Sequence, residues 1–235
     1  MFTKISNKFK SKNFDNRKKK ISFIILHYTE TKSLSEAIKL LTSKKRKVSC
    51  HFIVDKDGVI YDLVDINFRA WHAGESKWKK SSDINSRSIG IEIVNFGEKS
   101  KDKFTNEQIN SLINLIKFLK KKYKIRNNKI LGHSDIAPLR KIDPGKYFPW
   151  EYLSKKSIGI WVQNEKNNKA LSHNQFCTFL KNLKRIGYPN ITSYQLSKNN
   201  KKVIDSFHRH HVTNLVNKLP NMQSLIKSEN LLKKY

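Results

Sequence analysis

Short apolar runs, each followed by polar or turn-forming residues, recur through the first half of the chain. Runs of about four to eight apolar residues between turn signals are typical of buried β-strands. The runs lie at residues 21–27, 51–55, 59–64, 89–95 and 129–132. Asp57-Gly58, between the second and third runs, favours a hairpin turn. The pattern therefore predicts a mixed β-sheet.

Two segments carry the start signals and the periodicity of helices. One is expected over about 33–44, and the other begins at the capping-box pattern Thr105-x-x-Gln108 and runs to about residue 123. Apolar side chains recur at helical spacing in the second: Ile109, Leu112, Ile113, Ile116 and Leu119. Such a stripe packs against a core. We therefore predict an α/β (α+β) fold, with a mixed central β-sheet flanked by helices.

Composition divides the chain into three parts. Residues 1–20 are rich in Lys and are expected to form a disordered or loosely attached basic arm. Residues 21–160 contain the predicted sheet and form the main domain. After a polar linker, residues 170–235 are expected to form a small helical domain, in which Ser172-x-x-Gln175 caps the first helix.

A segment with candidate chemistry follows the last apolar run. Residues 131–145 place His133, Lys141 and Asp143 among Gly and Pro residues, which stop the segment from continuing as a helix. His27 also ends an apolar run, so both imidazoles are expected at one edge of the sheet. Two imidazoles and a carboxylate form a three-ligand zinc set with a fourth position open to water. Taken singly, each residue is more often a cap or a turn residue.

Four stretches, occurring in one order, carry a resemblance to a known family. They are Leu26-His27-Tyr28-Thr29, Trp71-His72-Ala73-Gly74, Ile89-Gly90-Ile91-Glu92-Ile93 and residues 133–145. Together they resemble the zinc-dependent N-acetylmuramoyl-L-alanine amidases of the AmpD/AmiD type (amidase type 2), relatives of phage amidases and peptidoglycan recognition proteins. The resemblance covers roughly residues 20–160. The tail is weakly similar to the peptidoglycan-binding domain that accompanies some of these enzymes.

The resemblance implies a bacterial hydrolase with one bound zinc ion. It assigns His27, His133 and Asp143 as zinc ligands, with Asp143 in the place that a Cys often takes in phage and animal relatives. It makes Glu92 the acid/base and Lys141 the group that stabilises the oxyanion. The implied reaction is hydrolysis of the amide between the lactyl group of N-acetylmuramic acid and L-alanine, in peptidoglycan or in muropeptides, including anhydro-muropeptides. Without the motif, Glu92 would be an ordinary strand carboxylate and Lys141 a surface group.

Further side chains of the matched segments are candidates for the binding cleft. Trp71, His72 and Arg140 are expected to contact substrate. Trp78 offers another flat aromatic face, unless the two Trp side chains only pack at the rim. His51 has a matching position in the family without being a metal ligand, and we expect it to make a supporting or structural hydrogen bond.

The tail adds a His-rich cluster, His208-Arg209-His210-His211. Because this cluster contains no Cys or acidic residue, it is expected to be exposed or structural rather than metal-binding. Since every matched catalytic residue precedes position 165, residues 1–165 are predicted to hydrolyse small soluble muropeptides without the tail.

The charge of the chain leaves three kinds of partner open. Lys and Arg number 48 against 19 Asp and Glu, a net charge of +29. Such a charge suits nucleic acid, an acidic polymer such as peptidoglycan, or a coding bias toward Lys with no partner at all. Nucleic acid is disfavoured because no nucleic-acid motif is present. We expect a monomer that binds peptidoglycan or a muropeptide. The main alternative is a non-catalytic peptidoglycan-binding protein.

Targeting signals and cysteines add little. No segment approaches the roughly 20 apolar residues of a membrane span, and the N-terminal residues lack the hydrophobic core of a signal peptide. Cys50 and Cys177 lie outside the matched motifs and predict neither a disulfide framework nor a metal ligand. The implied substrate favours the cell envelope or periplasm, and the missing signal leaves the cytoplasm open.

Overall fold

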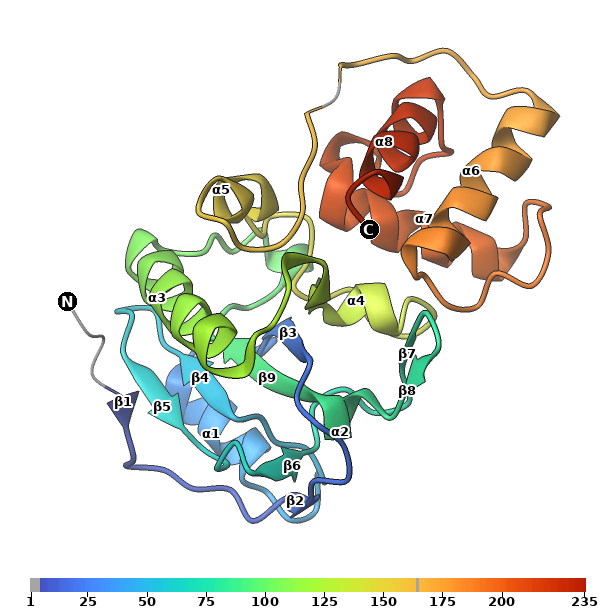
Figure 1. Cartoon of the computed structure of the whole chain (residues 1–235). Coiled ribbons are helices and arrows are strands. Elements are labelled where there is room, and N and C mark those ends of the chain that lie inside the picture. Colours follow the sequence, from blue (N-terminus) through green and yellow to red (C-terminus); the bar gives the residue numbers. More distant parts are fainter. Residues whose placement is uncertain (1–4, 164) are drawn as a thin grey trace.

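A six-stranded sheet forms the centre of the computed structural model, which describes residues 5–163 and 165–235 (Figure 1). The strands lie in the order β1 (Ile5–Ser6), β5 (Ile60–Asp62), β4 (Phe52–Val54), β9 (Ser88–Ile93), β3 (Phe23–Tyr28) and β10 (Ile130–Gly132). β3 is parallel to both β9 and β10, and β9 is parallel to β4, whereas β4 and β5 are antiparallel. The predicted mixed sheet is confirmed, and each predicted run overlaps a strand.

Each face of the sheet has its own core, because successive side chains of a strand point to opposite faces. In β3, Ile24 and Leu26 join the cluster that α3 (Asn106–Tyr123) covers. Ile25 joins a different cluster on the opposite face. His27, two positions after Ile25, therefore projects from this second face. The edge where the parallel strands end thus presents a histidine beside an apolar core.

Helices begin where the sequence predicts them. The Ser33 hydroxyl accepts a hydrogen bond at the start of α1 (Leu34–Leu41), and α3 begins with the predicted capping box at Thr105. Ala37 and Leu41 of α1 pack with Ile53 of β4 in a third cluster. This cluster lies on the same face of the sheet as His27, because His27, Glu92 and Ile53 occupy partnered positions of β3, β9 and β4. A wall of α1 therefore stands beside the edge that carries His27.

The N-terminal arm is part of the fold, and the expectation of a loosely attached segment is wrong for its described residues. β1 pairs with β5, and β2 (Phe14–Asn16) pairs with β6 (Phe68–Ala70). The Arg17 guanidinium, at the end of the arm, donates to several backbone carbonyl oxygens: those of Ile66, Phe68, Asn85, Ser86 and Ser88. Residues 1–4 of the predicted arm lie outside the described part.

The polar stretch of residues 67–88 contains several short elements. It contains β6, the small antiparallel pair β7 (Lys77–Trp78) and β8 (Ser81–Ser82), and the single-turn helix α2 (Ile84–Arg87). This stretch passes the edge of the sheet where β3 ends and supplies residues Trp71 and His72 to the pocket described below.

The tail is helical, as predicted. α5 (Trp150–Lys155) ends the main domain, and the tail contains α6 (His173–Ile186), α7 (Lys198–His211) and α8 (Met222–Leu232). Ser172 and Gln175 form the predicted capping box of α6. Within the described ranges, no helix has the length and apolar character that a membrane crossing needs.

The tail and the sheet share one hydrophobic core. The cluster on the second face of the sheet joins main-domain side chains to tail side chains: Phe23, Ile25, Leu131 and Ile136 with Phe179, Leu183, Val203 and Phe207. A separately folding tail would need a core of its own. The structure therefore gives no support to the expectation that residues 1–165 stand alone, because a chain cut there would expose the main-domain side chains of this cluster to water.

Candidate metal centre and active site

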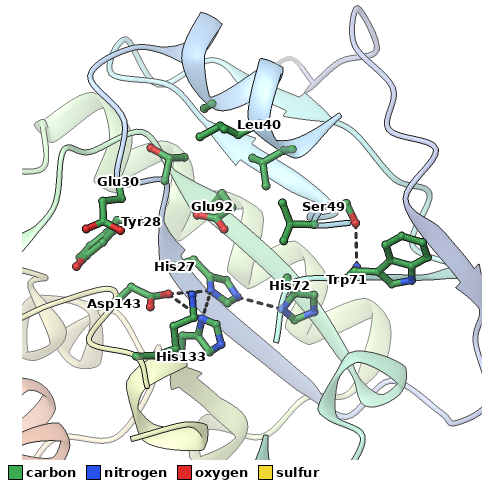
Figure 2. Close-up of a pocket in the computed structure, with 15 residues that line it drawn as sticks. His27, Tyr28, Glu30, Leu40, Ser49, Trp71, His72, Glu92, His133 and Asp143 are labelled. Carbon is green, nitrogen blue, oxygen red and sulfur yellow. Dashed lines mark hydrogen bonds and ion pairs between the residues drawn. The ribbon is translucent and has the colours of Figure 1, made fainter. Parts of the chain in front are cut away.

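A pocket of about 170 Å³ lies where β3, β9 and β10 end (Figure 2). His27 and Glu92 line it from the sheet, and Lys141 lines it from the turn after α4. Leu40 and Leu41 of α1 form an apolar wall. A concave site with an apolar wall and a few converging polar groups is the usual form of a small-molecule site.

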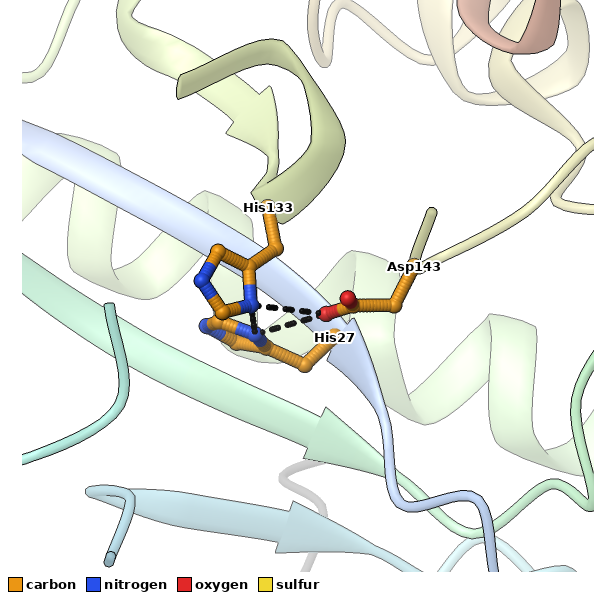
Figure 3. A group of neighbouring side chains, drawn as sticks. All are labelled: His27, His133 and Asp143. Carbon is orange, nitrogen blue, oxygen red and sulfur yellow. Dashed lines mark hydrogen bonds and ion pairs between the residues drawn. The ribbon is translucent and has the colours of Figure 1, made fainter. Parts of the chain in front are cut away.

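Three of its polar atoms converge on one point (Figure 3). His27 belongs to β3, His133 begins α4 (His133–Ile136) directly after β10, and Asp143 lies in the following turn. His27 Nδ1 lies 3.0 Å from His133 Nδ1 and 2.9 Å from Asp143 Oδ2, and His133 Nδ1 lies 3.0 Å from Asp143 Oδ2. Zinc ligands at about 2.1 Å in tetrahedral geometry lie about 3.4 Å apart, so the triangle is close to the size that a zinc ion requires.

The hydrogen bond on the other side of the His133 ring indicates that this triangle suits a cation. His133 Nε2 lies 3.1 Å from the carbonyl oxygen of Ala73, which only accepts hydrogen bonds, so Nε2 carries the proton and Nδ1 presents a lone pair. The Asp143 carboxylate adds electron pairs at the same point. If His27 Nδ1 is also unprotonated, the three electron-rich atoms repel one another unless a cation lies among them. Among the described residues, this is the one group of His, Cys, Asp or Glu arranged to hold a metal.

The electrostatics keep His27 and Asp143 in the protonation states that metal ligands need at neutral pH. Burial, together with the neighbouring His133, lowers the pKa of His27 to about 4. Burial alone would raise the pKa of Asp143, but His133 and His27 outweigh it and hold that pKa well below its usual value. Metal ligands must be deprotonated. A neutral His27 and an ionised Asp143 meet that requirement.

Glu92 faces the same point from the next strand. It occupies the position of β9 that partners His27 of β3, so both side chains project from the same face of the sheet. Burial raises the pKa of Glu92 well above its usual value, and Asp143 raises it further, while Lys141 opposes the shift. Within the part of the chain that the structure describes, its Oε2 atom is buried without a hydrogen-bond partner. A buried carboxyl group with a raised pKa is suited to take up and release a proton during a reaction.

The three predicted substrate contacts differ in their surroundings. Trp71 lines the pocket, and its indole Nε1 donates to Asp15 at 2.7 Å. His72 also lines the pocket, but it is only 8% exposed and its ring contacts His27. Arg140 is not among the lining residues, and its guanidinium donates to the carbonyl oxygens of Ala73 and Glu75. Arg140 thus supports the segment around Ala73.

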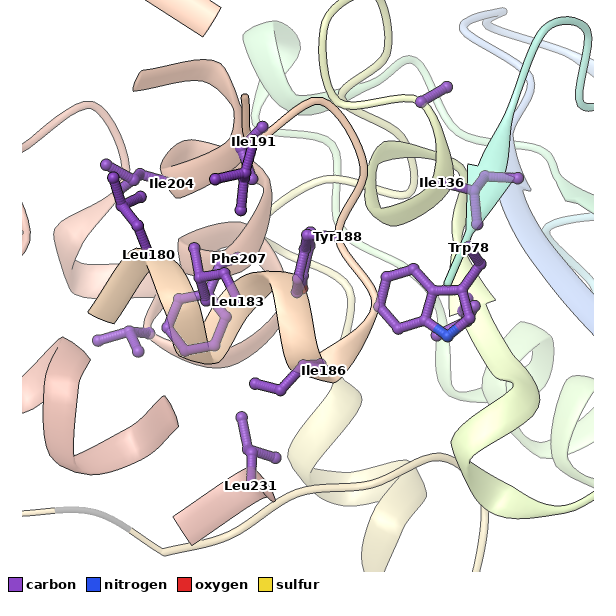
Figure 4. Close-up of a cluster of buried hydrophobic side chains, with 14 of the residues drawn as sticks. Trp78, Ile136, Leu180, Leu183, Ile186, Tyr188, Ile191, Ile204, Phe207 and Leu231 are labelled. Atoms are coloured by element: carbon purple, nitrogen blue, oxygen red, sulfur yellow. The ribbon is translucent and has the colours of Figure 1, made fainter. Parts of the chain in front are cut away.

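Trp78 does not face the pocket and is excluded as a substrate contact. Its side chain is 1% exposed and lies in the core shared with the tail (Figure 4). The indole lies 5.1 Å from the Tyr188 ring, between centroids. Gly187 makes this packing possible, because a Cβ at that position would come within 2.5 Å of the indole. An aromatic residue in a polar stretch looked exposed in the sequence because its partner is more than a hundred residues away.

The other predicted histidines are structural. His51 Nδ1 accepts a hydrogen bond from the Gly90 N–H at 2.9 Å, which confirms the expected supporting role. In the tail, His208 and His210 are buried, and His210 stacks on Trp150 with ring centroids 3.8 Å apart. The cluster is therefore structural rather than exposed, and it belongs to no metal-ligand group within the described ranges.

Several supporting residues escaped the sequence analysis. Asn85 Oδ1 accepts hydrogen bonds from the backbone N–H groups of His72 and Ala73, at 3.1 and 2.7 Å. Ser88 contacts the far side of His72. Gly90 had a signal, since a glycine inside a strand marks close approach by another group, and here that group is the His72 ring. Asn85 and Ser88 had none, because a small polar residue near a turn is ordinary.

Comparisons with known proteins agree with this geometry. A family model described as N-acetylmuramoyl-L-alanine amidase matches residues 17–146. The chain is 33% identical to the N-acetylmuramoyl-L-alanine amidase AmiD of Escherichia coli K12, over 92% of this chain and 84% of that protein. It is 44% identical to the 1,6-anhydro-N-acetylmuramyl-L-alanine amidase AmpD of Haemophilus influenzae, over 46% of this chain and 58% of that protein.

Solved structures extend the likeness to the whole chain, tail included. Escherichia coli AmiD, in complex with anhydro-N-acetylmuramic acid-L-Ala-D-γ-Glu-L-Lys, aligns with a TM-score of 0.83 at 30% identity, covering 94% of this chain and 93% of that one. AmpDh3 of Pseudomonas aeruginosa aligns with a TM-score of 0.79 at 25% identity, covering 100% and 99%. The resemblance seen in the motifs is confirmed, and this chain belongs to the N-acetylmuramoyl-L-alanine amidase family.

Proposed function

We propose that this chain is a zinc-dependent enzyme that hydrolyses the amide bond between the lactyl group of N-acetylmuramic acid and L-alanine. Family membership supports the reaction class. The observation that carries the proposal for this chain is the convergence of His27, His133 and Asp143 at one point, with Glu92 on the adjoining strand. A site with an acid/base beside three ligand atoms has the parts that amide hydrolysis needs.

The ligand set favours zinc. His27 and His133 would hold the ion through Nδ1 and Asp143 through Oδ2, which leaves a further position open, as catalytic zinc sites do. When bound, zinc acts as a Lewis acid that polarises the scissile carbonyl and makes water a better nucleophile at neutral pH. The protein supplies the dry walls and the fixed orientation of the three ligands.

Glu92 and Lys141 divide the remaining work. In its ionised form, Glu92 takes a proton from the attacking water and then gives it to the departing amine of L-alanine. Its raised pKa favours the transfer to the amine, because a carboxyl group with a higher pKa keeps the proton bound until that transfer occurs. Lys141 lines the same pocket, and its ammonium group stabilises the negative charge that develops on the carbonyl oxygen.

The proposed substrates are peptidoglycan and muropeptides, including those with a 1,6-anhydro sugar. Two relatives were solved with such ligands: AmiD with an anhydro-muramyl tripeptide, and AmpDh3 with anhydromuramic pentapeptide. Trp71, at the pocket, is the best placed of the predicted substrate contacts. The net charge of +29 favours a substrate that carries carboxylates. A monomer acting in the bacterial envelope fits this substrate, and action on soluble fragments in the cytoplasm is the alternative.

A direct product assay tests the proposal. The purified full chain is incubated with sacculi and with anhydro-muropeptides, with and without a zinc chelator, and products are identified by mass spectrometry. We expect release of the stem peptide with a free L-alanine amine, and its loss after chelation. Binding without release would favour the non-catalytic alternative. The presence of both Glu92 and Lys141 speaks against that alternative, because a pure binding protein needs neither a base nor an oxyanion partner.

A further inference from the structure

One short segment, residues 71–74, contacts both histidine ligands on the side of each ring that faces away from the metal triangle. His72 Nδ1 lies 3.0 Å from His27 Nε2, and the Ala73 carbonyl oxygen lies 3.1 Å from His133 Nε2. The segment is itself fixed, because its backbone N–H groups donate to Asn85. The ring atoms that face away from the metal triangle therefore all contact one rigid piece of chain.

Ser88 determines where the protons lie in the hydrogen bonds that link it to His72 and His72 to His27. The Ser88 hydroxyl donates to the Ile84 carbonyl oxygen at 2.6 Å. A hydroxyl has one proton to donate, so toward His72 Nε2, at 3.0 Å, Ser88 is an acceptor and His72 Nε2 carries the proton. His72 Nδ1 is then the acceptor for His27 Nε2–H. His27 Nδ1 is left unprotonated, with its lone pair inside the metal triangle.

The opposite order of protons would block the metal. If Ser88 donated to His72, then His72 Nδ1–H would donate to His27, and the His27 proton would sit on Nδ1 between the ligands. The Ile84 carbonyl oxygen favours the first order, because the second order would leave this buried acceptor without its hydrogen bond. Ser88 and Ile84 are both 0% exposed, so water does not replace the lost partner.

Close packing keeps His72 in this position. The ring lies against the backbone of Gly90, where a Cβ atom would come within 2.3 Å of it. It also meets the His51 ring edge to face, with centroids 5.7 Å apart. His72 therefore has little freedom to turn and exchange the roles of its two nitrogens.

We propose that Ser88 and His72 are positioning residues that fix the tautomer of His27, while the Ala73 carbonyl oxygen does the same for His133. This inference rests on the proposed metal site, and it gives His72 a role different from the substrate contact expected from the sequence. Hydrogen bonds behind metal-binding histidines typically change metal affinity by about 10- to 100-fold when removed. The same range is expected here.

The first test reads the tautomer directly. The full chain, loaded with Zn²⁺ and labelled with ¹⁵N in its histidines, is studied by NMR near pH 7. We expect His72 to carry its proton on Nε2 and to accept, at Nδ1, the hydrogen bond from His27 Nε2–H. A spectrum in which His72 carries its proton on Nδ1 would overturn the proposal. This measurement involves no turnover, so it stands or falls apart from the proposed reaction.

The second test measures Zn²⁺ affinity by competition with a chelator. Ser88→Ala and His72→Phe are expected to weaken zinc binding by about 10- to 100-fold. His72→Asn, whose amide oxygen can replace the Nδ1 acceptor, should recover part of that loss. Ser86→Ala is the control, because Ser86 is equally buried in the same stretch without contacting His72. Wild-type affinity in Ser88→Ala, or equal losses in Ser88→Ala and Ser86→Ala, would refute the positioning role.

Discussion

Asp135 Oδ2 lies 2.7 Å from His210 Nδ1, so a residue of α4 is bonded to the last turn of α7 in the tail. The same carboxylate accepts hydrogen bonds from the Gly132 N–H and from the Tyr188 hydroxyl. Because α4 begins at His133, these bonds tie the placement of a metal ligand to the tail. The tail thus contributes to the geometry of the site as well as to the fold.

Removal of residues 166–235 should abolish activity even on small soluble muropeptides. The truncated chain would expose the shared core and leave Asp135 without its tail partners, so we expect it to unfold or to aggregate. Circular dichroism and the product assay on the same sample provide the measurement, with the full chain as control. A folded fragment with full activity would show that residues 1–165 fold and act without the tail, as the sequence predicted.

Glu92→Gln should lower kcat by about 10²- to 10⁴-fold while zinc stays bound, because the amide keeps the shape of the side chain but cannot accept the proton. Kinetics together with elemental analysis separate the two effects. Glu107→Gln, on the exposed start of α3, is the control. An unchanged kcat would remove Glu92 from the mechanism.

Lys141→Ala should reduce kcat by about 10²-fold or more and change KM less, because the ammonium group is proposed to act on charge that develops in the transition state. The neighbouring Lys146→Ala should leave kcat near that of the wild type. An effect confined to KM would instead show that Lys141 binds the ground-state substrate.

Asp143→Ala should lose zinc. Two neutral imidazoles alone hold the ion weakly, and the negative charge that offsets the ion disappears with the carboxylate. Asp143→Cys should retain the metal, because a thiolate is a sound zinc ligand, and should lower activity, because the thiolate donates more charge to the ion. Elemental analysis of both variants gives the result. Stoichiometric zinc and full activity in Asp143→Ala would contradict the proposed ligand set.

Buried histidines should make the metal-free protein less stable in acid. Burial, with Arg17 nearby, lowers the pKa of His51 to about 3, and burial lowers the pKa of His208 to about 3. In the unfolded chain these groups bind protons below about pH 6.5, whereas in the folded chain they do not. Their stabilising contribution is therefore complete above about pH 6.5 and is lost as the pH falls toward 3.

Urea unfolding at pH 7 and pH 5 measures this effect. His208→Gln should reduce the difference in unfolding free energy between the two pH values. His173→Gln, which alters an exposed histidine of the tail, should leave that difference unchanged. If that difference in unfolding free energy is the same for His208→Gln and the wild type, His208 is not part of the pH response.

The sequence predicted what local patterns encode. Apolar runs and capping boxes located the strands and helices, and the spacing of His27, His133 and Asp143 within matched motifs pointed to the site. Contacts between distant segments carried no such signal. Arg17 bonds to backbone carbonyls, which any sequence offers, and Trp78 meets its partner Tyr188 only in the folded chain. The polar contacts of Ser88 are equally invisible, because they depend on the approach of His72.

The core that the sheet shares with the tail limits how such chains can exchange parts, in evolution or in design. Phe23 and Ile25 of β3 pack in one cluster with Phe207 of α7, and Trp78 rests on Gly187. A tail grafted from a relative would bring one half of this interface without the other. We expect working chimeras to require matched substitutions on both sides, so that the amidase and tail segments are inherited together rather than shuffled as interchangeable modules.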